Sequence, residues 1–491
     1  MNFLNYLSGS IFGVSFIWAP ILHVAIVILF GFHMISVRRP VAVSIAWFLI
    51  VVLFPLIGVS LYILIGERPV GRKLTRKIIR MDKEYAAITG DMRKHYQADR
   101  QLLPIEGRAL SLLAESKNGS PVIAGNKLEL FTSSLEILQC FVDEINQAKK
   151  TLHLEFYIWA LGGDADRVGE ALIAAAKRGV ACKVLLDSLG SNDWFKSSWP
   201  NRFRKAGIQV GEALPIQIGR LQFRRADLRL HRKIFVIDNA IVWTGSMNMV
   251  DPRSFKQDSG VGEWVDAMVR IEGPVASPFE LTFSFDWSVD NPKITHFNKA
   301  APALMPIEGN VLAQEFSSGP VYRDDILYQV LLSAIMDARE ELTITTPYFG
   351  PDDGLIQALM AAAGRGVKVT LIVPKLNDST LVAWSSRSFY TDLMNAGVKI
   401  AEFHGGLLHT KSLLIDKRVA IFGSVNFDQR SLRLNFEISL IVYNDEFCAK
   451  LQTLIETYLA KSDMVDPVSW SKRPHWRVLL ENAAHLTSPL L

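Results

Sequence analysis

Two stretches of the sequence carry the same set of reactive side chains at the same intervals. The first, HRKIFVIDNAIVWTGSMN, supplies His231, Lys233, Asp238, Ser246 and Asn248; the second, HTKSLLIDKRVAIFGSVN, supplies His409, Lys411, Asp416, Ser424 and Asn426. Strand residues two apart point to the same face, so the histidine and lysine of each copy share a face, as do the serine and asparagine. Each copy therefore predicts an imidazole, an ammonium, a hydroxyl and an amide in one small area.

Two such groups brought together would form a cationic pocket rich in hydrogen-bond donors. A pocket of this kind suits a phospho group, a tetrahedral anion whose charge is spread over its oxygens. Two histidines on opposite sides could divide an in-line displacement, in which one attacks phosphorus and the other protonates the departing oxygen and then deprotonates the incoming one. The pattern predicts a covalent phosphohistidine and no cofactor or metal, because the lysines replace a metal cation. A single copy would carry little weight, since histidine and lysine are common on solvated strands.

Each histidine also needs an acceptor for its second ring nitrogen. We expect Glu437, in NFEISLIV, and Asp266, in WVDAMVRI, to orient the histidines, with a strand-end carboxylate that faces water as the alternative. Asp238 and Asp416 belong to the repeated catalytic set, but each lies five residues after the motif lysine at a predicted turn. We therefore expect these two aspartates to brace a hairpin rather than touch substrate.

The surrounding sequence predicts the elements that position these residues. AAAKRGVACKVLLD (174–187) resembles AAAGRGVKVTLIVP (361–374), and each predicts the end of a helix, a glycine turn and a buried strand. In the motifs, IFVI and AIVWTG are strand-like runs on either side of Asp238-Asn239. Alternating helices and strands predict an α/β fold with two pseudo-symmetric α/β/α halves, 121–295 and 296–491, related by a pseudo-two-fold axis.

Two long apolar runs precede these halves. Residues 11–35 and 41–65 contain no Asp, Glu, Lys or Arg and are joined by the short connector SVRRP. Each run is long enough to cross a hydrocarbon core as a helix, so residues 1–66 predict a transmembrane hairpin. A cleaved signal peptide and buried soluble helices are the alternatives, but the first ten residues lack Lys and Arg and a second full run follows.

A basic segment follows the second apolar run. Residues 67–83 contain seven Lys or Arg against two acids, within a predicted juxtamembrane linker, 67–120. The positive-inside rule places the catalytic halves on the cytoplasmic face, although Arg38 and Arg39 favour the opposite orientation. The whole chain has a net charge of +4, and outside this basic segment it is close to neutral. This charge distribution argues against nucleic acid as a partner. The three cysteines of the chain lack a C-x-x-C spacing and indicate a reducing compartment.

The repeated pattern H-x-K-x4-D-x6-G-S-x-N resembles the phospholipase D superfamily. Further stretches, GSMNMVDPRSF, TTPYFGPDD, FHGGLLHTKS, SLRLNFEI and the final SPLL, resemble the bacterial cardiolipin synthases over nearly the whole chain. The resemblance implies two phospholipase D-type halves and a multi-pass enzyme of the bacterial inner membrane. It also implies that one phosphatidylglycerol gives its phosphatidyl group to a histidine, glycerol leaves, and a second phosphatidylglycerol attacks to give cardiolipin. By this resemblance His231 is the nucleophile and His409 the acid and base, although pseudo-symmetry leaves their order open.

Other functions are compatible with parts of this pattern. A hydrolytic phospholipase D and a transferase that uses another alcohol would carry the same motifs. A nuclease of the superfamily fits poorly with the apolar runs, and a catalytically inactive membrane scaffold fits poorly with two complete motifs. The sequence does not reveal the oligomeric state.

Two further segments suggest contact with lipid. Twenty-four residues separate Gly207 from His231, whereas 12 separate Gly397 from His409, and the longer segment carries Arg220, Arg224, Arg225 and Arg229. These arginines are predicted to contact lipid headgroups, with a solvated loop as the alternative. The tail WSKRPHWRVLLENAAHLTSPLL mixes basic, tryptophan and leucine residues and predicts an interfacial segment, or else a plain surface helix.

Overall fold

The computed structural model describes residues 18–37, 41–66, 90, 92–118, 120–215, 227–289, 305–320 and 325–486. The chain divides into two compact units, Met1–Arg72 with Ile216–Asp227, and Lys73–Pro215 with Leu228–Leu491. The basic run 67–83, Arg38 and Arg39 of the connector, and Arg220, Arg224 and Arg225 lie outside the described residues.

The described part of the first unit contains four apolar helices. They are α1 (Trp18–Ser36), α2 (Val41–Leu53), α3 (Pro55–Leu61) and the π-helix η2 (Tyr62–Gly66). The second apolar run is expected to form one helix, but it breaks at Phe54, whose φ of −138° and ψ of 74° are not helical. Pro55 explains the break, because proline lacks an N–H group and disfavours a helical conformation in the residue before it. Across the described part of the chain, no helix has both the length and the apolar character needed to span a membrane, so the predicted hairpin is not confirmed.

The second unit is built on one mixed sheet of 16 strands. Strands of the first half are β1 (Ile123–Phe131), β2 (Thr151–Phe156), β3 (Ala181–Asp187), β4 (Gln209–Ala213), β6 (Ile234–Ile237), β7 (Ile241–Gly245) and β9 (Met268–Glu272). Those of the second are β10 (Val311–Ser318), β11 (Glu341–Thr345), β13 (Lys368–Pro374), β14 (Lys399–Phe403), β16 (Ser412–Ile415), β17 (Val419–Gly423), β19 (Asn435–Tyr443) and β20 (Ser462–Met464).

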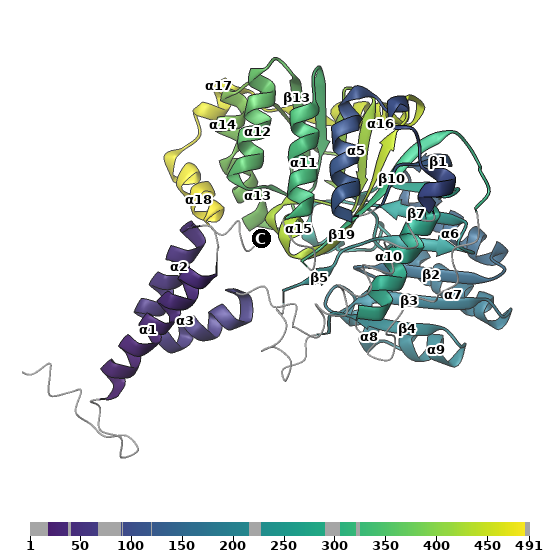
Figure 1. Cartoon of the computed structure of the whole chain (residues 1–491), viewed down its shortest axis with the longest axis horizontal. Coiled ribbons are helices and arrows are strands. Elements are labelled where there is room, and N and C mark those ends of the chain that lie inside the picture. The colour runs from purple at the N-terminus through teal and green to yellow at the C-terminus, as the bar shows by residue number, and fades with distance from the viewer. Residues whose placement is uncertain are drawn as a thin grey trace, which may run out of the picture. The chain divides into compact units, whose positions relative to one another are not determined.

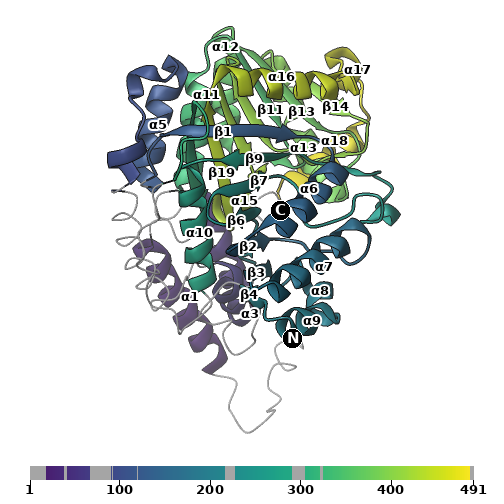
Figure 2. The ribbon, with the colours of Figure 1, turned by 90° about the vertical axis from the view of Figure 1, so that its right-hand side faces the viewer.

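The order of the strands reveals the internal repeat. The first half runs β1-β9-β7-β6-β2-β3-β4, as Figure 2 shows from top to bottom, and the second runs β10-β19-β17-β16-β11-β13-β14-β20. Each first-half strand on this path thus has a counterpart in the second half. The halves join where β1 pairs antiparallel with β10, so the predicted pseudo-symmetric arrangement forms one continuous sheet.

Helices cover both faces of this sheet. Figure 1 shows the main ones: α6 (Ser134–Gln147), α7 (Gly163–Lys177) and α10 (Ala276–Val289) of the first half, and α11 (Ile326–Asp337), α12 (Asp353–Gly364) and α16 (Asp445–Leu459) of the second. The apolar side chains of α10 and α16 share one core with strands of both halves. On the other face, α6 and α7 form a core with the first half, and α11 and α12 form one with the second. This layering confirms the predicted α/β class.

The shorter helices connect these elements or cap the sheet. They are η3 (Arg100–Leu102), α8 (Asn192–Lys196), α9 (Trp199–Lys205), η5 (Gln257–Ser259), α13 (Thr380–Ser388), α14 (Tyr390–Asn395), α15 (Gln429–Arg433), α17 (Pro467–Ser471) and α18 (His475–His485). The tail predicted to be interfacial contains α18, whose Trp476 and Leu479 are exposed by 59% and 70%.

The predicted linker 67–120 ends in a packed helix rather than in a connecting segment. Helix α5 (Ile105–Asn118) lies against α11, and its Leu110 and Ala114 belong to the core of the second half. These two apolar residues are four positions apart and so lie on one helical face. The end of the predicted linker is therefore part of the catalytic unit.

Matching hairpins carry the two motifs. Asp238 and Asn239 turn between β6 and β7 with φ of 50° and 57°, and Asp416 and Lys417 turn between β16 and β17 with φ of 49° and 54°. Two successive residues with positive φ are the mark of a type I′ turn, which suits the twist of paired strands. The predicted hairpin turns are confirmed.

The two turn aspartates bind the backbone at the start of the neighbouring strand. The Asp238 carboxylate accepts hydrogen bonds of 2.6 to 2.9 Å from the amides of Lys149, Lys150 and Thr151 at the start of β2. The Asp416 carboxylate accepts three bonds of 2.8 to 2.9 Å from the amides of residues 339–341 before and at β11. Both aspartates therefore tie a hairpin to the adjacent strand.

We predict that Asp238→Ala lowers the free energy of unfolding by about 2 kcal/mol, because three amides lose a charged acceptor and alanine disfavours positive φ. Asp238→Asn should lose about half as much, since asparagine keeps one acceptor and tolerates this conformation. Urea unfolding of both variants in detergent measures the difference. An Asp238→Ala enzyme of unchanged stability and no activity would contradict the structural role.

Candidate active site

Two short strands that cross between the halves position the histidines. Strand β5 (Arg229–Leu230) runs parallel to the start of β19, and β15 (Leu407–Leu408) runs parallel to β8 (Trp264–Val265). As a result, the His231 amide donates to the Phe436 carbonyl at 2.9 Å, and the His409 amide donates to the Val265 carbonyl at 2.8 Å. The backbone of each histidine is thus hydrogen-bonded to the opposite half, at the residue immediately before Glu437 or Asp266.

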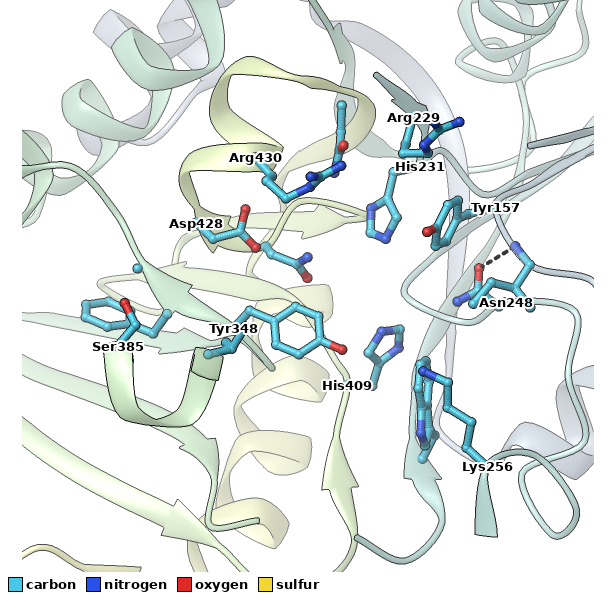
Figure 3. A pocket seen from close by; sticks show the side chains of 17 residues that line it. Tyr157, Arg229, His231, Asn248, Lys256, Tyr348, Ser385, His409, Asp428 and Arg430 are labelled. Carbon is cyan, nitrogen blue, oxygen red and sulfur yellow. Dashed lines mark hydrogen bonds between the residues drawn. The ribbon is translucent and has the colours of Figure 1, made fainter. Parts of the chain in front are cut away.

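The carboxylates hold the histidines in a reciprocal arrangement. Nδ1 of His231 lies 3.0 Å from both oxygens of Glu437, and Nδ1 of His409 lies 2.7 Å from Oδ1 of Asp266. An ionised carboxylate can only accept, so the shared proton lies on Nδ1 and the lone pair of Nε2 remains available for chemistry. Figure 3 shows both rings directed into one pocket. The sequence suggested the two carboxylates but did not predict that each pairs with the histidine of the other half.

The motif serines support the carboxylates instead of facing the pocket. Ser246 Oγ donates to Asp266 at 2.6 Å, and Ser424 Oγ donates to Glu437 at 2.5 Å. Both hydroxyls also accept a backbone amide, that of Ala267 or Ile438. Neither serine lines the pocket, and their expected role in substrate binding stays a prediction.

The glycine before each serine allows this contact. A Cβ at Gly245 would lie 2.4 Å from the Ala267 carbonyl oxygen, and one at Gly423 would lie 2.3 Å from the Ile438 carbonyl oxygen. Real Cβ atoms do not approach an oxygen so closely, so a side chain would separate the paired strands. The Gly-Ser pair in each motif therefore follows from packing around the buried carboxylates.

The motif lysines lie beneath the histidines and are fully buried. Lys233 Nζ donates to the His231 carbonyl and Lys411 Nζ donates to the His409 carbonyl, both at 2.6 Å. Burial lowers the pKa of Lys233 to about 8, against the opposing effect of Glu437 and Asp266, and holds the pKa of Lys411 well below its usual value. Neither lysine lines the pocket, but each lies directly behind a histidine that does, and burial weakens the hold of each lysine on its proton.

Burial also sets the charge of the histidines. It lowers the pKa of His231 and of His409 to about 4, an effect that the neighbouring lysines strengthen and the paired carboxylates oppose. Although burial favours the protonated form of Glu437 and Asp266, the facing histidine and lysine hold both carboxyl pKa values below the usual range. Near neutral pH the site therefore holds two uncharged imidazoles on two ionised carboxylates.

The motif asparagines reach the pocket. Asn248 and Asn426 both line it, and Asn248 Oδ1 accepts from the Ile158 amide at 3.2 Å (Figure 3). Oδ1 of Asn426 is buried and has no hydrogen-bond partner among the described residues. The two amides are thus the members of the predicted substrate-binding set that can touch a ligand directly.

The pocket has a volume of about 280 Å³. Besides the histidines and asparagines, its lining includes Tyr157, Ile158, Arg229, Lys256, Trp264, Tyr348, Phe349, Gly350, Val382, Ser385, Asp428, Arg430 and Asn435. Sequence reasoning named only Arg229 of these. A second repeat could have indicated Asp428 and Arg430, because an Asp-x-Arg-Ser sequence follows both Asn motifs, in NMVDPRS and NFDQRS.

Aromatic rings lie against both imidazoles. The Tyr157 ring centroid lies 5.1 Å from that of His231, and the Trp264 ring centroid lies 4.2 Å from that of His409. These rings take the place of water around the imidazoles, which is consistent with the lowered pKa values. No local pattern in the sequence marks the two aromatic residues, since they reach the histidines from separate strands.

Comparisons with known proteins agree with this geometry. The family model described as cardiolipin synthase, PLD-like domain, matches residues 141–287 and 331–459, and a phospholipase D-nuclease N-terminal model matches residues 24–67. Cardiolipin synthase A of Edwardsiella ictaluri is 43% identical over 92% of this chain and 94% of its own, and that of Cronobacter sakazakii is equally similar over the same shares.

A solved structure shares the fold. The phosphatidylserine synthase of Haemophilus influenzae matches 78% of this chain and 100% of its own with a TM-score of 0.58 at 16% identity. At that identity the likeness concerns the fold alone. The matched family model, which covers both halves, and the identity along almost the full length show that the chain belongs to the cardiolipin synthases of the phospholipase D superfamily.

Proposed function

We propose that this pocket transfers the phosphatidyl group of one phosphatidylglycerol to a second, giving cardiolipin and glycerol through a phosphohistidine. The observation that carries the proposal is the pair of uncharged imidazoles, each held through Nδ1 by a buried carboxylate of the opposite half and both directed into one pocket. Nucleophilic and acid-base catalysis need such oriented rings with Nε2 available.

In the first step, Nε2 of His231 attacks phosphorus and the P–O bond to glycerol breaks. The departing oxygen takes a proton from Nε2 of His409, so glycerol leaves as a neutral alcohol. Lys233, Lys411, Asn248 and Asn426 stabilise the charge on the remaining phosphoryl oxygens. Because the buried imidazoles are uncharged in the free pocket, the proton on His409 must be acquired as the anionic phosphodiester binds and raises the pKa of this ring.

In the second step, the primary hydroxyl of another phosphatidylglycerol enters where glycerol left. His409, now neutral, takes the proton of this hydroxyl while its oxygen bonds to phosphorus and the P–N bond to His231 breaks. One phosphodiester is exchanged for another, so the reaction needs no nucleoside triphosphate. A pocket with aromatic and apolar walls disfavours water as the competing acceptor.

We further propose that the enzyme is a membrane protein, held through its amino-terminal segment and its carboxy-terminal tail beside its lipid substrates. Helices α1 and α2 expose large apolar side chains, among them Leu29, Phe32 and Leu53 at 67% to 69%. In the tail, α18 exposes Trp476 and Leu479 beside Arg477, a combination that suits the interfacial region of a bilayer. A hairpin across the inner membrane with the catalytic unit on the cytoplasmic face remains the predicted topology.

Purified enzyme in detergent, given phosphatidylglycerol alone without nucleotide or metal, should release cardiolipin and glycerol in equal amounts. His231→Ala and His409→Ala should each lower turnover by at least about 10³-fold, because either loss removes a group needed in both steps. Lipid chromatography and a glycerol assay measure the products. Phosphatidic acid as the main product would show that water is the acceptor and would contradict the transferase.

Glu437→Gln should lower kcat by about 10³-fold with little change in KM, because an amide cannot hold the Nδ1 proton of His231 as a carboxylate does. Asp266→Asn is the matched variant of the other half and should act in the same way on His409. Steady-state kinetics with a thermal unfolding control measure both. An effect confined to KM would exclude the orienting role.

Lys233 should make anion binding depend on pH. Its pKa of about 8 means that it is charged below this pH and neutral above it, so the inhibition constant of sulfate, a phosphoryl analogue, should increase as pH rises past about 8. Competitive inhibition between pH 7 and 9.5 measures the effect, and Lys233→Ala should bind sulfate weakly without this transition. A constant inhibition constant in the unaltered enzyme would show that Lys233 does not contact the anion.

A further inference from the structure

The two halves use the same Asp-x-Arg-Ser sequence in different ways. In the first half, Asp251 accepts from the side chain of Arg253 at 2.6 and 2.9 Å and from the Asp164 amide at 2.9 Å. These contacts tie Asp251 to the start of α7, and Asp251 does not line the pocket. In the second half, the counterpart Asp428 lines the pocket instead. The repeat therefore loses its symmetry at this position.

Asp428 is more than nine-tenths buried, with 8% of its surface exposed. Its Oδ1 accepts from the Ser431 amide at 2.7 Å and so caps α15. The Asn426 side chain also hydrogen-bonds to this carboxylate, whose two oxygens can take about four bonds, so capacity to accept remains. The part of this capacity that faces the pocket is available to a ligand.

The neighbours of Asp428 in the pocket include the cation of Arg430 and two polar, uncharged side chains. Ser385 and Asn435 line the same pocket and are exposed by only 2% and 7%. Ser385 Oγ and Asn435 Oδ1 have no hydrogen-bond partner among the described residues, although Asn435 Nδ2 donates to Glu437 at 3.3 Å. Buried polar atoms without a partner are uncommon in proteins and indicate a group that a ligand completes.

Asp428 and Ser385 lie on one side of the histidine pair (Figure 3), and Asn435 lies beside Glu437, the partner of His231. Figure 3 shows Asp428, Ser385 and Tyr348 on one side of the imidazoles and Tyr157, Asn248 and Lys256 on the other. Arg430 lies on the same side (Figure 3) and offsets part of the charge of Asp428, but the oxygens of Asp428 are acceptors, so this side suits a ligand that donates hydrogen bonds. A neutral polyol is such a ligand, because its hydroxyls donate to the carboxylate and the amide oxygen and exchange a hydrogen bond with the serine.

We propose that Asp428, Ser385 and Asn435 form a subsite for the free hydroxyls of the glycerol headgroup of phosphatidylglycerol. The inference rests on the proposed function. The leaving and the entering alcohol occupy the same position in the two displacements, so one subsite beside the histidine pair serves the departing glycerol and then the headgroup of the second lipid. Asp428 thereby selects glycerol over water and over alcohols with no further hydroxyl.

The test compares two donor lipids that differ only in these hydroxyls. Phosphatidylglycerol and phosphatidylpropanol have three-carbon headgroups, but the second has no free hydroxyl. Asp428→Asn keeps an acceptor for the helix cap and removes the charge. This variant should raise KM for phosphatidylglycerol by about tenfold and shift products from cardiolipin towards phosphatidic acid, while release of propanol from phosphatidylpropanol changes less than about twofold.

Two further variants separate this role from folding. Ser385→Ala removes one unpartnered hydroxyl and should raise KM for phosphatidylglycerol by about threefold, again without affecting phosphatidylpropanol. Asp251→Asn alters the matching aspartate outside the pocket and should leave the ratio of cardiolipin to phosphatidic acid unchanged.

Equal losses with both donors in Asp428→Asn, or no change with either, would overturn the inference. An unaltered enzyme that yields only phosphatidic acid would contradict the proposed transferase. In that case a selective rise in KM for phosphatidylglycerol would still support the glycerol subsite, because glycerol is then only the leaving group.

Discussion

The reciprocal pairing of histidine and carboxylate across the two halves is the constraint on which the catalytic unit depends. Glu437 and Asp266 are almost completely buried, and each takes its histidine partner from the other half. A buried carboxylate without a partner is strongly destabilising, so neither half has a satisfied interior alone. The antiparallel joining of β1 and β10 and the crossing strands β5 and β15 are therefore requirements of the active site as much as of the fold.

Much of this arrangement could be predicted because its signals are local. The I′ turns at Asp238 and Asp416, the alternating helices and strands, and the shared face of each histidine and lysine all follow from neighbouring residues. The break in the second apolar run could also have been predicted, since Pro55 interrupts this run. Length and absence of charge are therefore insufficient to predict one continuous helix.

The pairing of the histidines with their carboxylates and the roles of the serines could not be predicted from the sequence, because they depend on contacts between distant segments. His231 and Glu437 are 206 residues apart, and only the parallel pairing of β5 with β19 brings them together. The roles of the serines have the same origin, since the direction of Ser246 Oγ is set by a carboxylate on a neighbouring segment. The motifs thus identify the reactive side chains but not which half supplies the partner of each.

The histidine pair is symmetric between the two halves, whereas the pocket residues around it are not, and these two features have separate physical causes. Displacement at phosphorus needs a similar environment for the bond that forms and the bond that breaks, which favours two equivalent histidines. Burial keeps both imidazoles uncharged in the free pocket, so in the proposed mechanism the anionic substrate has to raise the pKa of His409 before this ring can act as the general acid. The choice of alcohol, in contrast, does not require two equivalent groups. Asp428 lines the pocket whereas Asp251 is bound by Arg253 outside it, so the proposed alcohol subsite can differ between the halves while the histidine pair stays symmetric.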